Sequence, residues 1–191
     1  MTQARAPRAD AVRNRRKILG AAGEQLTAHG PEVGMDEIAA AAGVAVGTLY
    51  RHFPTKTDLI AAVIAEYVAR VADDAEAALG RVAAGARAVD ELTAFLGRVV
   101  ETSAADRAVK AAAKALGAEP GDTSAEDRAG AAVAGLVRAG QSDGDIHPDV
   151  TVDDIYLLFS TAPTDRPAAA RTRWLTLVVP GLTTVARPAH G

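Results

Sequence analysis

Two short segments with helical apolar spacing, joined by a glycine, constrain the fold of this 191-residue chain more than any other feature. The first segment, residues 35–42, carries acidic residues in its opening turn, where the helix dipole favours them. Gly43 follows, and a glycine at that point supplies the left-handed backbone that ends a helix. The second helix is expected over residues 46–53, with Leu49 and Phe53 on one face. The pattern predicts a helix-turn-helix, which favours DNA binding.

The residues on either side of this motif indicate further helices. Thr55 and Asp58 match a capping box directly after Pro54, so a new helix is expected to begin there. Upstream, the start of another expected helix is crowded with the cations Arg13, Arg15, Arg16 and Lys17. Cations oppose the positive end of a helix dipole, so we expect them to face another partner, and DNA phosphates would fit.

The motif resembles the signature of TetR-type transcriptional regulators in the run Gly43-Val-Ala-Val-Gly-Thr-Leu-Tyr-Arg-His-Phe-Pro-Thr-Lys56. The likeness covers the first third of the chain. It implies an all-α protein with an N-terminal three-helix helix-turn-helix DNA-binding domain and a C-terminal helical ligand-binding and dimerisation domain. The expected bounds are a flexible basic arm over residues 1–12, the DNA-binding domain over 13–60 and the helical domain over 61–191.

The resemblance also implies roles for the second helix and its flanks. Phosphate contacts, which fix register without reading sequence, are expected from Thr48, Tyr50, His52 and Lys56. Base reading is expected from Ala45, Val46, Gly47 and Arg51. Only Arg51 among these has the forked donor that pairs with guanine, a contact worth about 1–3 kcal/mol of discrimination. Val46 stands where many relatives carry a long polar residue, so a thymine methyl is its expected contact.

Arginines at the amino end extend this set. Arg15 and Arg16 are expected to bind DNA as well. Arg5 and Arg8 have two interpretations that the sequence leaves open: insertion into a minor groove, or a solvated tail.

Charge is distributed unevenly along the chain. Residues 1–60 hold 8 Lys and Arg against 6 Asp and Glu, whereas residues 61–191 hold 13 against 18. A protein polarised in this way binds DNA through one face, with modest non-specific affinity, so two copies are expected to share the binding. The expected partner is a palindromic double-stranded operator bound by a homodimer.

Composition narrows the class further. The chain is 49% apolar but only 4% aromatic, alanine is abundant, and no strand pattern stands out, so an all-α protein is expected. It contains no cysteine, which excludes disulfides and thiolate metal sites. No metal-ligand spacing occurs either, and neither a metal nor a cofactor is expected. With no apolar run near 18 residues and no signal-peptide core, we expect a cytoplasmic protein without membrane contact.

Helical spacing continues through the rest of the chain. One long helix is expected from Thr55 to about Leu79, with Gly80 as its stop. Further helices are expected over residues 89–102, 106–116, 124–139, 151–159 and 168–179, the third of them ended by Gly140. The segment Val137–Ile155 resembles the carboxy-terminal half of SbtR-like regulators.

The expected C-terminal domain has two tasks in the family that the chain resembles. The dimer interface is expected to use Tyr156, Phe159, Trp174, Leu175 and Val178, since large aromatic residues favour interfaces. A cavity for an unknown small apolar effector is expected to be lined by Phe95, Leu96, Val99, Leu136, Tyr156 and Phe159. For each of these residues ordinary core packing is the alternative.

Two other function classes compete with a regulator. Gly140-Gln-Ser-Asp-Gly144 matches the nucleophile elbow of serine hydrolases, but the elbow needs a preceding strand, and the residues before it have helical spacing. We therefore expect a turn and no enzyme. The remaining alternative is a helical ligand-binding or partner-binding protein that no longer binds an operator.

Overall fold

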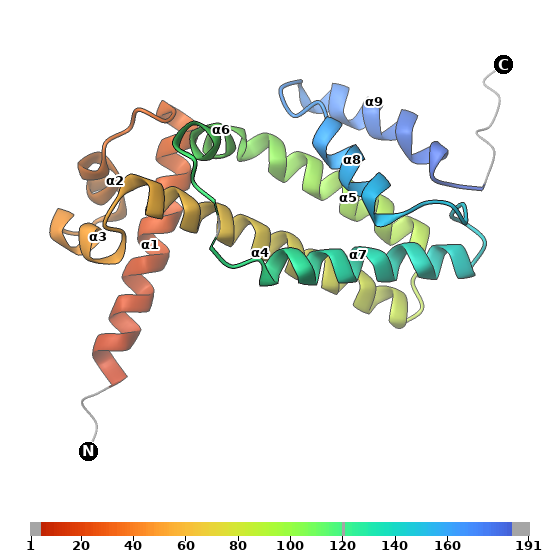
Figure 1. Ribbon diagram of the computed structural model, residues 1–191, viewed down its shortest axis with the longest axis horizontal. Helices are drawn as coiled ribbons and strands as arrows, with labels where there is room; N and C mark the ends of the chain where they lie inside the picture. Colours follow the sequence, from red (N-terminus) through yellow and green to blue (C-terminus); the bar gives the residue numbers. More distant parts are fainter. Residues whose placement is uncertain (1–4, 120, 185–191) are drawn as a thin grey trace. The chain divides into compact units, whose positions relative to one another are not determined.

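The computed structural model describes residues 5–119 and 121–184, and within them it is helical, apart from one isolated antiparallel bridge between Ile146 and Thr183. In chain order the elements are α1 (Arg5–His29), α2 (Met35–Ala42), α3 (Val46–His52), α4 (Lys56–Ala83), α5 (Ala88–Ala105), α6 (Arg107–Leu116), α7 (Ser124–Ser142), α8 (Val152–Thr161), α9 (Ala168–Val178) and the 3-10 helix η1 (Val179–Gly181) (Figure 1). The all-α prediction is confirmed. No helix of the described ranges is both long and apolar enough to cross a bilayer.

The chain divides into two compact units that differ from the expected domains. The first contains residues 1–67 and 105–122, and the second contains residues 68–104 and 123–191. The expected boundary at residue 60 lies inside α4, a continuous helix of 28 residues. The expected arm over residues 1–12 is already helical from Arg5 onward, while residues 1–4 lie outside the described part.

The first unit owes its composition to the burial of α6. Val109, Ala112 and Ala113 on this helix belong to the same apolar core as Ile18 and Leu26 of α1. The core also takes in α2, α3 and the beginning of α4. A helix that follows the reading motif by more than fifty residues is therefore packed with it, a long-range pairing that helical periodicity does not reveal.

The second unit has a separate core built from α4, α5, α7 and α8. Phe95, Leu96 and Leu136 are each at most 1% exposed within it. Ile155 closes the core from α8, and Leu182 closes it from the segment after η1. Burial of this kind stabilises the fold by roughly 1.5–3 kcal/mol per large side chain.

Arginine–carboxylate pairs connect the helices of the second unit at its surface. Arg128 of α7 donates to both Asp73 and Glu76 of α4 at 2.6 Å, and Arg98 of α5 reaches Asp74 at 2.9 Å. The hydrogen bonds from Arg128 lower the pKa of Glu76. Because the pairs are exposed, we expect each to contribute little stability and to act mainly on helix register.

Two glycines that were expected to end helices do not end them. α4 continues through Gly80 to Ala83, and α7 continues through Gly140 to Ser142. Gly140 instead permits close packing, because a Cβ there would lie 2.4 Å from Cδ1 of the buried Ile146. Gly117 and Gly43 are helix ends, with positive φ values of 60° and 65°.

This contrast gives a paired stability prediction. Gly140→Ala should destabilise the protein by about 1–2 kcal/mol, since the added methyl overpacks against Ile146. Gly80→Ala should stabilise it by roughly 0.5–1 kcal/mol, since a Cβ there meets no atom within 4 Å and alanine is the better helix former. Urea unfolding of both variants measures the difference, and equal midpoints would contradict the packing role of Gly140.

Candidate nucleic-acid interface

The interface begins with the turn between α2 and α3. Gly43 takes the left-handed conformation, and its N–H donates to the Ala40 carbonyl at 3.1 Å. The next N–H, from Val44, donates to the Ala39 carbonyl at 3.0 Å. These bonds satisfy carbonyls at the end of α2 and turn the chain tightly into α3. The predicted helix-turn-helix is thus formed by α2 and α3.

One face of α3 is fixed in the core of the first unit. Leu49 is fully buried, and Phe53, which follows the helix, is 2% exposed. The Phe53 N–H donates to the Leu49 carbonyl at 2.8 Å, so both residues hold the end of α3 in place. Burial of these two side chains determines the direction of all the others on the helix.

Several other side chains of α3 are presented to solvent. Val46 is 42% exposed and Tyr50 is 48% exposed, and Arg51 is exposed beside them. Ala45 and Gly47 are also exposed, whereas Thr48 and His52 are half-buried at its edges. Among the expected base-reading and phosphate-contacting residues of α3, Val46, Gly47, Tyr50 and Arg51 are thus exposed, while Thr48 and His52 are partly covered.

The start of α4 has the expected capping box. Asp58 Oδ2 accepts hydrogen bonds from the backbone N–H of Thr55 at 3.0 Å and from its hydroxyl at 2.7 Å. In return the Asp58 N–H donates to the Thr55 hydroxyl at 3.1 Å. This end of α4 is therefore rigid and points backbone donors outward.

Lys56 has a protein partner that its position in the motif does not indicate. Its ammonium group donates a hydrogen bond to the carbonyl of Pro31, in the turn between α1 and α2. The side chain is half-buried, unlike a freely solvated lysine. Lys56 thus ties the beginning of α4 to the α1–α2 turn, in addition to any contact with phosphate.

The cations of α1 are held in different ways. The Arg15 guanidinium lies over the Phe53 ring, 4.7 Å from its centroid, within the range of a cation–π contact. Arg13 pairs with Asp10 one turn earlier, while Arg16 and Lys17 are exposed. The side chains of Arg5 and Arg8 lie outside the described part of the structure. The Arg15 stack, which no local sequence signal indicated, places a positive charge beside the end of α3.

Family comparisons agree with this arrangement. A model described as bacterial regulatory proteins, tetR family, matches residues 18–63, and one described as transcriptional regulator SbtR-like, C-terminal domain, matches residues 87–184. A solved TetR transcription regulatory protein from Mycobacterium vanbaalenii is 36% identical, with 93% of this chain and 99% of that chain covered and a TM-score of 0.71. The chain belongs to the TetR family.

Other solved TetR proteins have the same architecture. A TetR transcriptional regulator from Streptomyces coelicolor is 30% identical, covering 90% of this chain and 99% of that chain, with a TM-score of 0.71. A ketosteroid transcriptional regulator of Mycobacterium tuberculosis is 19% identical, covering 90% of this chain and 95% of that chain, with a TM-score of 0.59, and shares the fold. The search of curated proteins gave no match.

TetR membership settles the class of function. The protein is a DNA-binding transcriptional regulator of the TetR family and not an enzyme. The structure agrees at the hydrolase-like string, because Ser142 lies in the last turn of α7 and its hydroxyl donates to the Arg138 carbonyl at 3.0 Å. The strand that a nucleophile elbow requires is replaced there by a helix.

The expected effector-binding residues are distributed differently in this TetR protein. Phe95, Leu96, Val99 and Leu136 are buried in the second core, and the Phe95 and Phe159 rings pack edge to face at 6.0 Å. Tyr156 is 46% exposed. A pocket of about 510 Å³ in the described part of the second unit is lined by other residues.

The expected dimer residues also divide into two groups. Phe159 and Leu175 pack against the second core, and Trp174 and Val178 are half-buried. The most exposed apolar side chains of α8 and α9 are instead Leu157 at 60%, Leu177 at 47% and Tyr156. Neither leucine was among the expected dimer residues. For Leu157 a signal existed, because the run of four apolar residues from Tyr156 to Phe159 is too long for all of them to face one core.

Proposed function

We propose that the protein is a repressor that binds an inverted-repeat operator as a dimer and is released from it by a small-molecule inducer. The single observation that supports operator reading best is that Leu49 anchors α3 in the core while Val46, Tyr50 and Arg51 of the same helix are exposed. A helix so anchored presents a fixed set of side chains to a major groove.

Each exposed residue of α3 is assigned a contact by its chemistry. Arg51 pairs bidentately with guanine, and Val46 contacts a thymine methyl, while Ala45 and Gly47 let the backbone approach the base edges. Thr48, Tyr50 and His52 donate to phosphates. Arg15, Arg16 and Lys56 add phosphate contacts on the flanks, with Arg15 oriented by the Phe53 ring.

Dimerisation is proposed through α8 and α9. Tyr156, Leu157 and Leu177 leave apolar surface in water on these helices, and exposed apolar surface of this kind marks an interaction site. A dimer also meets the geometric need of an inverted repeat, since two reading helices must lie about 34–36 Å apart to enter successive major grooves. We also propose a cytoplasmic location, because a regulator of this kind must reach the DNA that it binds.

Release by an inducer is proposed to act through the segments that connect the two units. The chain passes between units inside α4, between α5 and α6, and between α6 and α7. α4 is continuous from the capping box beside α3 to Ala83 in the second unit. A ligand that prefers one arrangement of the second unit would shift the population of operator-competent dimers by its differential affinity.

The operator prediction is tested by selection from a pool of random duplexes with the purified full-length protein. We expect an enriched inverted repeat whose affinity falls as salt rises, because phosphate contacts release counterions. Arg51→Ala should weaken binding to that repeat by about 1–3 kcal/mol, through loss of a bidentate base contact. Arg138→Ala, the same change at an exposed position on α7, is the control and should bind normally. Absence of enrichment at low salt would favour the ligand-binding protein without an operator.

The dimer prediction is tested by analytical ultracentrifugation. Leu157→Glu and Leu177→Glu should each shift the protein toward monomer, because a charge in the apolar interface must be desolvated. Leu116→Glu is the matched control, since Leu116 is 43% exposed on α6 in the first unit. A dimer that survives both interface changes would contradict the assignment of α8 and α9.

A further inference from the structure

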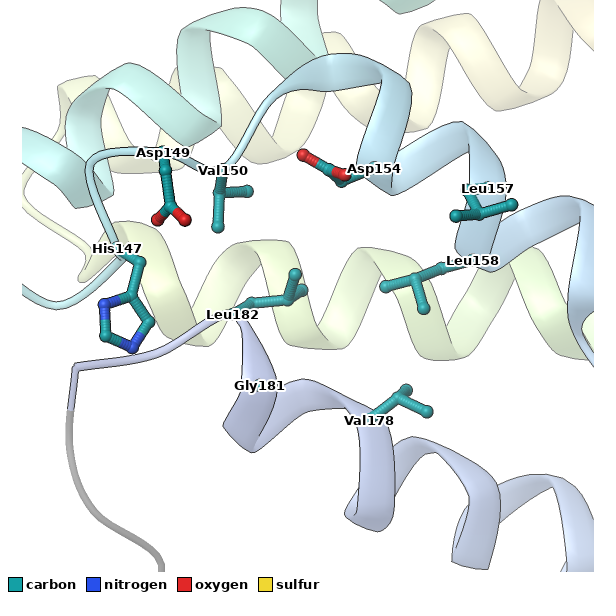
Figure 2. A pocket seen from close by; sticks show the side chains of 9 residues that line it. All are labelled: His147, Asp149, Val150, Asp154, Leu157, Leu158, Val178, Gly181 and Leu182. Carbon is teal, nitrogen blue, oxygen red and sulfur yellow. The ribbon is translucent and has the colours of Figure 1, made fainter.

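The pocket of the second unit lies where the α7–α8 loop, α8 and η1 meet. It has a volume of about 510 Å³, within the usual range for small-molecule sites. Its lining comprises His147, Asp149, Val150, Asp154, Leu157, Leu158, Val178, Gly181 and Leu182 (Figure 2). It is therefore distinct from the aromatic cluster of Phe95 and Phe159 in the core.

Hydrogen bonds hold the loop side of this pocket in a defined shape. The side-chain amide of Gln141 donates to the carbonyls of His147, Pro148 and Val150 at 3.1, 3.2 and 3.0 Å. The His147 N–H donates to the Leu182 carbonyl at 3.0 Å, which joins the loop to the segment after η1. A pocket held in this way loses little entropy when a ligand enters.

The chemistry of the lining is divided into an acidic part and an apolar part. Asp149 and Asp154 lie along one side in Figure 2, with Leu182 and Val178 across from them. Asp154 is held ionised, because hydrogen bonds from the side chain and backbone of Thr151 lower its pKa. The lining contains His147 but no Lys or Arg, so no permanently charged cation of the lining neutralises the aspartates.

We propose that this pocket is the effector site and that it takes a small organic cation, an ammonium or guanidinium group carried on an apolar body. The carboxylates of Asp149 and Asp154 receive the cation, and Leu158, Val178 and Leu182 receive the body. This assignment rests on the ligand-responsive repression proposed above.

The location of the pocket supplies a route from ligand to operator. Leu157 and Val178 line the pocket and also belong to the helices proposed to form the dimer. A ligand seated between α8 and η1 therefore contacts residues whose positions affect how two copies pack. The spacing of the two reading helices in the dimer would change with that packing.

The binding test uses isothermal titration calorimetry on the full-length protein without DNA. Two amines, tryptamine and hexylamine, are compared with analogues of the same body but different charge, namely tryptophol and hexanol, which are neutral, and indole-3-acetate and hexanoate, which are anionic. We expect an amine to bind more tightly than both of its analogues. Equal affinities across charge in both series, or no binding by either amine, would overturn the proposal.

Variants then locate the binding site. Asp149→Asn and Asp154→Asn should each weaken amine binding roughly threefold or more, by loss of an ion pair. Asp153→Asn makes the same change in charge on an exposed residue of α8 outside the lining, and should leave affinity unchanged. Asp149 is the decisive position, because Asp154 also caps α8. An equal loss in all three variants would show a diffuse charge effect and overturn the site.

A second measurement separates this proposal from operator binding itself. Fluorescence anisotropy on the selected operator should show weaker binding when the amine is added, and the Asp149→Asn variant should need more amine for the same effect. Amine binding that leaves operator affinity unchanged would overturn the effector assignment. Failure to bind any operator would instead contradict the proposed repressor function. The calorimetric test of amine binding uses no DNA, so its result would be unaffected.

Discussion

Burial of Leu49 and Phe53 in the first core is the interaction on which the reading surface depends. These side chains are 0% and 2% exposed, and they fix the rotation of α3 about its own axis. Val46, Tyr50 and Arg51 are left in solvent as a consequence. The Gly43 turn sets the angle at which α3 leaves α2, and the Thr55–Asp58 box begins α4 directly afterwards. A register change of one residue in α3 would turn Thr48 or Tyr50 toward the core in place of Leu49.

The two separate apolar cores explain how a regulator can bind DNA with one unit and respond to a ligand with another. α6 belongs to the first core through Val109, Ala112 and Ala113, although it follows α5 of the second unit. α4 runs without a break from the first unit into the second, and we propose that it carries a rearrangement of the second unit to the first. The proposed cation pocket uses only residues of the second unit, beside the helices that carry exposed Leu157 and Leu177. Ligand and dimer contacts thus share one region.

Much of this architecture could be predicted from sequence because it depends on local rules. Gly43 and Gly117 end helices, Thr55 and Thr151 form capping boxes, and Leu49 faces the core, all within a few residues of their partners. Two features could not be predicted because they depend on contacts between residues distant in sequence. These are the packing of α6 with α1 and the stacking of Arg15 on Phe53. The prediction that Gly140 ends a helix was wrong for a related reason. Gly140 reads as a helix stop, whereas its role is to leave room for Ile146, and only the fold reveals that contact.

Base reading by the exposed residues of α3 is tested best by a change of specificity at Val46. Selection from random duplexes would be repeated with Val46→Gln, which replaces a methyl contact with an amide that pairs with adenine. For the Val46→Gln protein we expect a new preferred base at one position in each half of the inverted repeat, with all other positions unchanged. The same repeat recovered with equal affinity from both proteins would contradict it, because Val46 would then lie away from the bases.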